Sequence, residues 1–414
     1  MPRSFTTSNI LHHISNIRMK KEICQEKKIF SVVPESGARY NEDDNDKVSL
    51  EFKGVRMKIE SKKWMYAGGI MLSVSFAVLF VSRRLEGTAQ WYSVHIYPVI
   101  VSLIGRMAGY VPVSVSELGL YALILIITVL LIHLIAGLIK GKKGKKEILH
   151  FLAGLFFTVS LLFLIYTLNC GINYHRESFS ESAGLVTEPY TVEDLKRVCI
   201  ILTEDVNDYA DKVDRDESGV MKLDGSERES AVEAMLLLGE TYPELQGYYP
   251  KPKGLINPWI LSVQNLSGVY SPFTVEANYN SGMTDYNIPF TACHELSHLR
   301  GFMQEQEANF IGYLACMESG KAEFNYSGSL LGWIYCMNVL RKVDLEAWKE
   351  VRQMLAPEAE VDLRANSEYW ARYDGKVAEV ADMVNDSYLK VNGQSDGVKS
   401  YDRMVDLMVT YYKE

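Results

Sequence analysis

The chain lacks the sequence features of a disulfide-stapled domain and of a nucleic-acid-binding protein. Its six cysteines are scattered through 414 residues, and no two of them stand in a C-x-x-C spacing. They therefore predict neither a disulfide framework nor a zinc ribbon. The formal net charge of −9 argues against general affinity for nucleic acid, so we expect no nucleic-acid partner.

A cleavage site for a signal peptide is also missing. The first long apolar run has a basic start, but Ser82-Arg83-Arg84 follows it where a small-x-small pattern would be needed. We therefore expect this run to stay in the mature chain.

Charged residues are almost absent from three long stretches of the first half, residues 64–82, 118–139 and 148–168. A bilayer crossing takes roughly 20 apolar residues, and each stretch is about that long. Buried helices of a soluble core are a poor alternative, because the stretches lack a polar face. The sequence predicts three transmembrane helices within residues 57–169, with the lipid bilayer as a partner.

Basic residues near the ends of these stretches predict their orientation. Lysines precede the first stretch and fill the short loop between the second and the third (Lys58, Lys62 and Lys63; Lys140, Lys142, Lys143, Lys145 and Lys146). Both segments therefore belong in the cytoplasm, although Arg83 and Arg84 argue the other way. By alternation, we expect a multi-pass protein of the cell membrane with a cytoplasmic N-terminus and an extracytoplasmic domain over residues 170–414.

Residues 1–56 are mixed and polar and show no periodicity, so we expect them to be disordered or a non-native extension. The residues Lys53-Gly-Val-Arg56 can be encoded by a purine-rich stretch that resembles a bacterial ribosome-binding site. We therefore expect translation to start at Met57, and N-terminal sequencing that found upstream residues would contradict this.

The predicted outer loop, residues 85–117, contains an amphipathic helical pattern at Ile96, Val99, Ile100, Leu103 and Ile104. It is consistent with a collar under the outer domain or in the membrane interface. A loosely packed linker is an equally good interpretation.

The motif His294-Glu-Leu-Ser-His298 stands out in the second half of the chain. On a helix its two histidines lie at i and i+4, so both imidazoles leave one face and can bind one Zn²⁺. Glu295 is offset from them, where its carboxylate can accept a proton from a water molecule that the metal activates. Gly301 suits a left-handed C-cap that ends the helix. A chance H-E-x-x-H on an ordinary helix is the plain alternative.

A catalytic zinc site needs a third protein ligand, and two glutamates are candidates. Glu305 begins a helical stripe of mostly small residues, which would let its helix lie close to the histidine helix (Ala308, Asn309, Gly312 and Cys316). Glu307 shares its face with apolar residues and is the reserve candidate. Asn309, one turn beyond Glu305, can hydrogen-bond a ligand.

Residues 261–280 are the best strand candidate and directly precede the motif. Glu276, Asn278 and Asn280 alternate along it. As an edge strand beside the metal, it would hold a substrate backbone by β-augmentation. A polar strand face that satisfies its own loops is an equally good interpretation.

Other elements of the outer domain are less specific. Helices are predicted over residues 191–212 and 226–242. Tyr326, Tyr388 and His175 are candidates for stabilising an oxyanion or a leaving group, and sequence position does not choose among them.

Several segments together resemble a bacterial family of membrane proteins of unknown function that is regarded as zincin-like. They are Ile96-Tyr-Pro98, Asn173-Tyr-His-Arg176, Pro272-Phe-Thr-Val-Glu-Ala-Asn278, His294-Glu-Leu-Ser-His298, Glu305-Gln-Glu-Ala-Asn-Phe310 and Asn392-Gly-Gln-Ser-Asp-Gly397. The resemblance covers residue 64 to the end. It implies a gluzincin-type site with His294 and His298 as ligands, Glu295 as base and Glu305 or Glu307 as third ligand, although the spacing from His298 is shorter than in most gluzincins.

The expected fold is mainly α: three transmembrane helices and then an α-rich α+β zincin-like extracytoplasmic domain. The expected function is a membrane-anchored zinc metallopeptidase, whose partner is a peptide or protein substrate of the cell envelope. The alternative is a non-cleaving zincin-like sensor or an envelope assembly or binding protein, for which an intact Glu295 is unnecessary.

Overall fold

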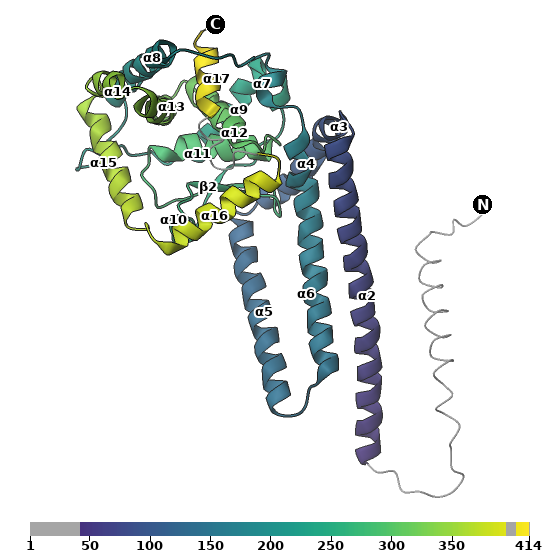
Figure 1. Cartoon of the computed structure of the whole chain (residues 1–414). Helices are drawn as coiled ribbons and strands as arrows, with labels where there is room; N and C mark the ends of the chain where they lie inside the picture. Colours follow the sequence, from purple (N-terminus) through teal and green to yellow (C-terminus); the bar gives the residue numbers. More distant parts are fainter. Residues whose placement is uncertain (1–41, 395–402, 414) are drawn as a thin grey trace, which may run out of the picture. The chain divides into compact units, whose positions relative to one another are not determined.

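A computed structural model describes residues 42–394 and 403–413 of the chain (Figure 1). The chain divides into two compact units, Met1–Met57 and Lys58–Glu414. We expected residues 1–56 to be disordered or a non-native extension. Residues 1–41 of this segment lie outside the described residues, and residues 42–56 form the first part of helix α2 (Glu42–Arg84). The end of the Asn392–Gly397 segment also lies outside them.

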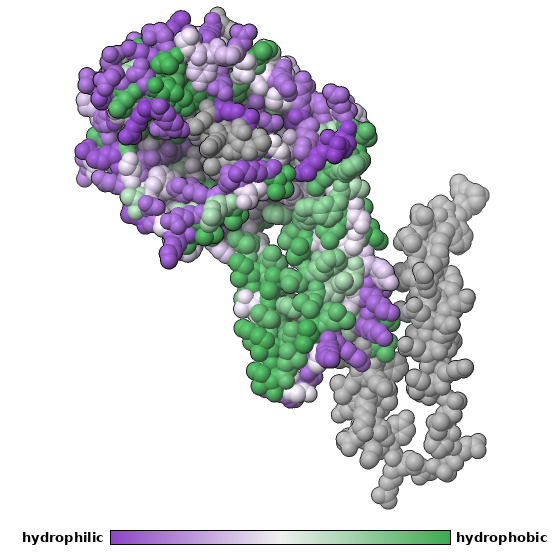
Figure 2. Space-filling model, in the orientation of Figure 1, coloured by the Kyte–Doolittle hydropathy of each residue, from purple (hydrophilic) through white to green (hydrophobic). Residues whose placement is uncertain are grey.

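The second unit is mainly helical, as predicted, and contains the three apolar helices. The stretches Val55–Arg84, Val115–Ile139 and Lys145–His175 are long and apolar enough to cross a membrane. They comprise most of α2, then α5 (Val115–Ile139) and α6 (Lys145–Tyr166), which continues through a π-helical turn, η2 (Thr167–Gly171), and a 3₁₀ turn, η3 (Asn173–His175). Few of their side chains are buried, and Figure 2 shows apolar colour over α5 and α6, as expected of a lipid-facing surface.

The segment between the first two apolar helices forms α3 (Thr88–His95) and α4 (Tyr97–Gly109). Tyr97 and Val101 on one face of α4 are buried in the core of the domain. The Tyr97 hydroxyl lies 2.8 Å from the Tyr270 hydroxyl and donates to the Leu299 carbonyl at 3.1 Å. The opposite face exposes Val99 and other apolar residues. The collar interpretation therefore describes this segment better than a loosely packed linker.

A three-stranded sheet precedes the motif helix in the chain. It consists of β1 (Lys253–Gly254), β2 (Gly268–Ser271) and β3 (Glu276–Tyr279) in the order β1-β3-β2, with β1 parallel and β2 antiparallel to β3. Residues 261–280 thus hold two strands of a hairpin. The prediction that Glu276, Asn278 and Asn280 lie on an edge strand is wrong, because β3 is central and all three side chains are buried.

Glu276 connects the sheet to α5 by hydrogen bonds and does not face a substrate. Its carboxylate accepts from the backbone N–H groups of Val115 and Ser116, at 3.1 and 2.8 Å, and forms a buried ion pair with Lys253. Asn278 donates to the Glu276 carbonyl at 3.2 Å. Asn280 donates to the Ser262 hydroxyl at 3.0 Å. The Glu276 carboxylate thus fixes the sheet to the N-terminal end of α5.

Helix α11 (Asn287–Leu299) packs against α9 (Glu227–Thr241), α12 (Glu305–Glu318), α13 (Ala322–Val343) and strands β2 and β3. The predicted helices 191–212 and 226–242 are present as α8 and α9, and the Thr191 side chain caps α8. The remaining elements are α7 (Phe179–Ser182), α8 (Val192–Ala210), α9 (Glu227–Thr241), η4 (Pro243–Leu245), α10 (Trp259–Ser262), α11 (Asn287–Leu299), α12 (Glu305–Glu318), α13 (Ala322–Val343), α14 (Leu345–Arg352), α15 (Pro357–Ala371), α16 (Lys376–Val391) and α17 (Met404–Tyr411).

Candidate metal centre

Helix α11 carries both histidines of the motif on one face, as predicted. The ring centroids of His294 and His298 are 4.6 Å apart. All residues of α11 are buried except His294, which is partly exposed to a cleft. The helix ends where Gly301 adopts a φ of 100°, a conformation that glycine tolerates best, and donates its N–H to the His298 carbonyl at 2.9 Å. This turn sends the chain back toward the histidines.

Helix α12 begins at Glu305, and its small residues allow close packing against α11. A Cβ atom at position 312 would lie 3.2 Å from the backbone nitrogen of His294, so a glycine there lets the two helix backbones approach. The small-residue stripe proposed from the sequence therefore does face the histidine helix.

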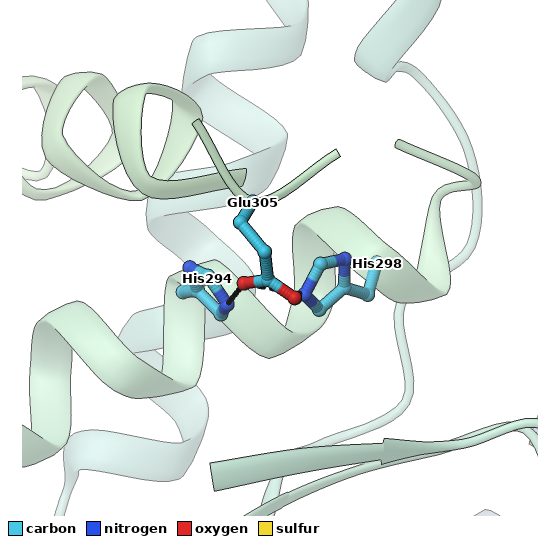
Figure 3. A group of neighbouring side chains, drawn as sticks. All are labelled: His294, His298 and Glu305. Atoms are coloured by element: carbon cyan, nitrogen blue, oxygen red, sulfur yellow. Dashed lines mark ion pairs between the residues drawn. The ribbon is translucent and has the colours of Figure 1, made fainter. Parts of the chain in front are cut away.

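The Glu305 carboxylate lies between the two imidazoles (Figure 3). Its Oε2 atom is 3.4 Å from His294 Nε2 and 3.7 Å from His298 Nε2, and the candidate ligand atoms of the three residues all lie within 4.8 Å of one another. A tetrahedral zinc site with ligand bonds of about 2.05 Å separates its ligands by about 3.3–3.4 Å. Two nitrogens and one carboxylate are a donor set that zinc accepts, so these residues fit the ion.

The other ring nitrogens differ in their contacts. His298 Nδ1 donates to the Phe302 carbonyl at 2.8 Å, because a carbonyl can only accept, so in the neutral imidazole Nε2 is the nitrogen with the lone pair that a metal would take. Within the described residues, His294 Nδ1 and Asn309 Nδ2 are buried without a partner. The predicted hydrogen bond from Asn309 to a ligand is thus not formed within the described residues, although Asn309 lines the same cleft.

The charges of this cluster favour a cation between its members. Burial lowers the pKa of His298, but the neighbouring Glu305 carboxylate outweighs this effect and raises that pKa to about 9. Burial likewise opposes the charge of Glu305, yet the two imidazoles hold the pKa of its carboxyl well below the usual range. In the metal-free chain Glu305 is therefore an anion, and the proton on His298 is the positive charge that balances it.

Glu295 lies on α11 beside the edge strand β2. Its side chain is buried, and its Oε2 atom has no partner among the described residues. Burial raises the pKa of Glu295 to about 7. A Cβ atom at position 268 would lie 2.5 Å from Glu295 Oε1, so only glycine at that place in β2 leaves room for the carboxylate.

Glu307 points away from the histidines. Its carboxylate accepts from the Ser180 N–H at 2.9 Å and from the Ser180 hydroxyl at 2.8 Å, and burial raises its pKa. Of the two glutamates considered from the sequence, the structure brings only Glu305 to the histidines.

The three clustered residues and Glu295 line a cleft of about 560 Å³. Its walls come from strand β2, the C-terminal end of the third apolar stretch, and helices α13 and α16. Representative residues are Gly268, Val269 and Tyr270; Cys170 and Tyr174; Leu331 and Tyr335; and Asp382, Asn385 and Tyr388. Sequence position did not indicate that the last apolar helix runs directly into the site.

Among the oxyanion candidates from the sequence, only Tyr388 lines the cleft. Tyr326 instead donates to the Asp362 carboxylate at 2.5 Å, and His175 accepts from Arg83 at 3.0 Å. Tyr335, which the sequence did not single out, also lines the cleft, and burial raises the pKa of its hydroxyl. Burial also raises the pKa of Tyr388, so the hydroxyls of Tyr335 and Tyr388 stay protonated and can donate a hydrogen bond.

Strand β2 lies within the predicted strand region 261–280, but the sequence assigned the edge beside the site to residues 276–280 instead. The signal that could have found it is Gly268, because an isolated glycine within a strand pattern often marks a close approach of another group. Here that group is Glu295.

A protein-family model described as "Protein of unknown function (DUF3810)" matches residues 92–409. The match includes α5, α6, the sheet and the whole metal cluster. No curated protein and no solved structure matches the chain.

Proposed function

The chain belongs to the DUF3810 family, whose function is unknown. From the residues of the cleft, we propose that it is a membrane-anchored, zinc-dependent peptidase with a zincin-like outer domain. The observation that carries this proposal is the meeting of His294, His298 and Glu305 beside the buried Glu295 in one cleft. Metal ligands, a base and a cleft are the parts that hydrolysis of a peptide bond by a zinc enzyme requires.

His294, His298 and Glu305 would hold the ion. Bound zinc supplies Lewis acidity, which polarises a scissile carbonyl and makes water a nucleophile near neutral pH. The chain's own part is to keep both Nε2 atoms turned toward the Glu305 carboxylate, which the contact of His298 with Phe302 supports.

Glu295 is the proposed general base and acid. It would accept the proton of the attacking water and deliver it to the leaving amine. Burial raises the pKa of Glu295 in the metal-free chain to about 7, and this raised affinity for a proton suits a base. Gly268 supports this role, because it leaves space for Glu295 at the edge of β2.

The edge strand β2 is the proposed support for the substrate backbone. It pairs with β3 on one side, and residues Ser267–Tyr270 of the same segment line the cleft. An extended peptide can add to such an edge through main-chain hydrogen bonds. Tyr335 and Tyr388 are the groups we assign to the developing oxyanion, since both are protonated donors in the cleft wall.

We place the cleft on the outer face of the cytoplasmic membrane of a bacterium. Three lysines in the loop that joins α5 and α6, together with Lys145 and Lys146 at the start of α6, favour a cytoplasmic position for this end. The opposite ends of the two helices, which adjoin the domain, then face outward. The substrate would then be a peptide or protein of the cell envelope.

Activity of a Glu295→Gln variant tests the proposal against a non-cleaving sensor or assembly protein. The full-length chain in detergent is incubated with a mixed peptide library, and cleavage is followed by mass spectrometry. We expect the wild type to cleave, and the variant to keep its zinc and lose about 10²–10⁴-fold in rate.

Glu307→Gln is the matched control, because it changes a buried glutamate two residues after Glu305 that does not contact the metal cluster. Equal rates for wild type and Glu295→Gln would remove the proposed mechanism. A wild type that binds zinc but cleaves nothing would favour the sensor.

A further inference from the structure

Helix α16 has an apolar face that the rest of the described chain leaves largely uncovered. Val377, Val380, Val384 and Val391 follow one another at helical spacing, and they are 59, 53, 63 and 70% exposed. Four exposed valines on one face are unusual for a helix in water and mark a surface that another apolar phase covers.

The opposite face of α16 is a wall of the cleft. Asp382 and Asn385 line the cleft together with Tyr388, which stands at the border between the two faces. One helix therefore separates the metal cluster from the apolar face. Because a helix with its side chains is about 10–12 Å across, the cleft wall and the apolar face of α16 are about that far apart.

The apolar face continues onto α10. A hollow of about 360 Å³ is lined by Trp259, Ile260 and Val263 of this segment together with valines of α16. Trp259 is 59% exposed. We call the following residues the apolar rim: Trp259, Ile260, Val377, Val380, Val384 and Val391.

The apolar rim also continues into the transmembrane surface. A groove of about 900 Å³ joins Val384 and Val391 to Phe76 and Phe80 of α2 and to Phe163 of α6. Phe76 and Phe80 are 61 and 63% exposed on a helix apolar enough to cross a bilayer. If lipid covers these phenylalanines, the same lipid therefore also contacts the apolar rim.

The depth of the groove places it in the outer leaflet. With a rise of about 1.5 Å per residue, Phe76 lies about 18 Å beyond Trp64, where the first apolar run begins, and Phe163 lies about 22 Å beyond Ile148. The hydrocarbon core is about 30 Å thick, so both residues are in its outer half.

Hydrogen bonds fix both ends of this surface to the outer ends of transmembrane helices. Arg83 at the end of α2 donates to the Val391 carbonyl at 3.0 Å. Glu117 in the first turn of α5 accepts from the backbone N–H groups of Ile256 and Asn257, at 2.8 and 2.9 Å, just before α10. The surface therefore lies at the level where these helices leave the bilayer.

We propose that the apolar rim is immersed in the outer leaflet of the bilayer, with lipid acyl chains as its occupant, so that the cleft lies directly above the lipid headgroups. Resting on the proposed function, this position makes the substrate a polypeptide that is tethered to the same membrane, by a lipid anchor or by its own apolar segment. Such a substrate reaches the cleft by diffusing within the membrane plane. A soluble peptide arrives from solution, so immersion of the apolar rim does not raise its rate of encounter with the cleft.

Site-specific photocrosslinking in lipid bilayers tests the immersion without any need for catalysis. A benzophenone amino acid replaces Val384 in the full-length chain, and Leu345 on α14, which is 49% exposed, is the matched control position. After illumination in phospholipid nanodiscs, we expect a phospholipid adduct at position 384 and none at position 345. No lipid adduct at position 384, or an adduct with a second copy of the chain or with another protein in its place, would overturn the proposal.

The substrate class is tested separately with Val380→Asp and Val384→Asp, which alter the rim and not the cleft. We expect cleavage of a vesicle-tethered peptide to fall at least tenfold, while cleavage of the same peptide in solution stays unchanged. Equal loss on both substrates, or no loss on either, would contradict the tethered class. If the wild type cleaves neither peptide, the peptidase proposal fails, and the crosslinking result still decides the immersion.

Discussion

His294 Nε2 lies 3.4 Å from Glu305 Oε2, although the two atoms belong to different helices. The turn that begins after α11, with Gly301 in a left-handed conformation, reverses the chain, and Gly312 lets α12 lie against the backbone of His294. A cluster of two imidazoles and one carboxylate is therefore built by a short, continuous part of the sequence. Its proposed role as a metal centre gives three predictions, and the corrected role of Glu276 gives a fourth.

The first prediction separates the two glutamates of α12. Loss of a group that only hydrogen-bonds a metal ligand lowers metal affinity by about 10–100-fold. Because Glu305 is a proposed ligand itself, Glu305→Gln should weaken zinc binding by more than this. Glu307→Gln should keep zinc and lower stability by about 1–3 kcal/mol, because one of the two Ser180 donors loses its acceptor. Zinc titration and thermal unfolding of both full-length variants measure these effects. The reverse pattern would make Glu307 the third ligand.

The second prediction concerns the space that Gly268 leaves for Glu295. Gly268→Ala would place a methyl group 2.5 Å from Glu295 Oε1 and 2.7 Å from Thr291 Cγ2, so the carboxylate must move. A displacement of this size costs about 10²-fold in rate when the group is catalytic. We expect that loss in cleavage assays at unchanged zinc content. Gly119→Ala is the control, since a Cβ there meets nothing within 4 Å, and equal activity of both variants would refute the role of Gly268.

The third prediction is a pH dependence of the metal-free chain. The pKa of His298 is about 9 in the fold and 6.5 in its absence, so the charged pair with Glu305 stabilises the fold fully below about pH 6.5. This stability is lost as the pH rises through about 9. Thermal unfolding with a chelator should therefore show a lower Tm at pH 9 than at pH 6.5, by about 2–4 °C for each kcal/mol of stability lost.

Zinc would replace the proton between the ligands, so the zinc-loaded chain should show a flatter Tm profile between pH 6.5 and 9. His298→Ala should abolish the slope of the chelated chain. A slope that persists in this variant would mean that other groups cause it.

The fourth prediction follows from the corrected role of Glu276. Glu276→Gln breaks a buried ion pair with Lys253 and weakens the hydrogen bonds that hold Val115 and Ser116. Loss of one partner of a buried pair costs about 3–5 kcal/mol, so we expect a strongly lowered Tm. The KM of the folded fraction for a peptide should not change. A raised KM with an unchanged Tm would restore Glu276 as a substrate contact.

The sequence predicted the parts of the site that depend on local periodicity. The i, i+4 spacing of His294 and His298, the stop at Gly301 and the stripe that begins at Glu305 each act within one or two helical turns. The three apolar helices were equally predictable, because length and composition alone define them.

Strand order was not predictable from local pattern. Glu276, Asn278 and Asn280 alternate as an edge strand would, but their acceptors and donors come from Lys253, α5 and Ser262, which no local pattern connects to them. Tyr388 and Tyr335 reach the cleft through long-range packing of α16 and α13, and sequence distance gives no indication of that.

The central claim is that His294, His298 and Glu305 bind zinc. The most direct measurement is the metal content of the full-length protein, purified in detergent, beside a His294→Ala variant. We predict close to one zinc per chain in the wild type, with loss of zinc in the variant at an unchanged helix content. A folded wild-type protein without zinc, or a variant that retains it, would contradict the account.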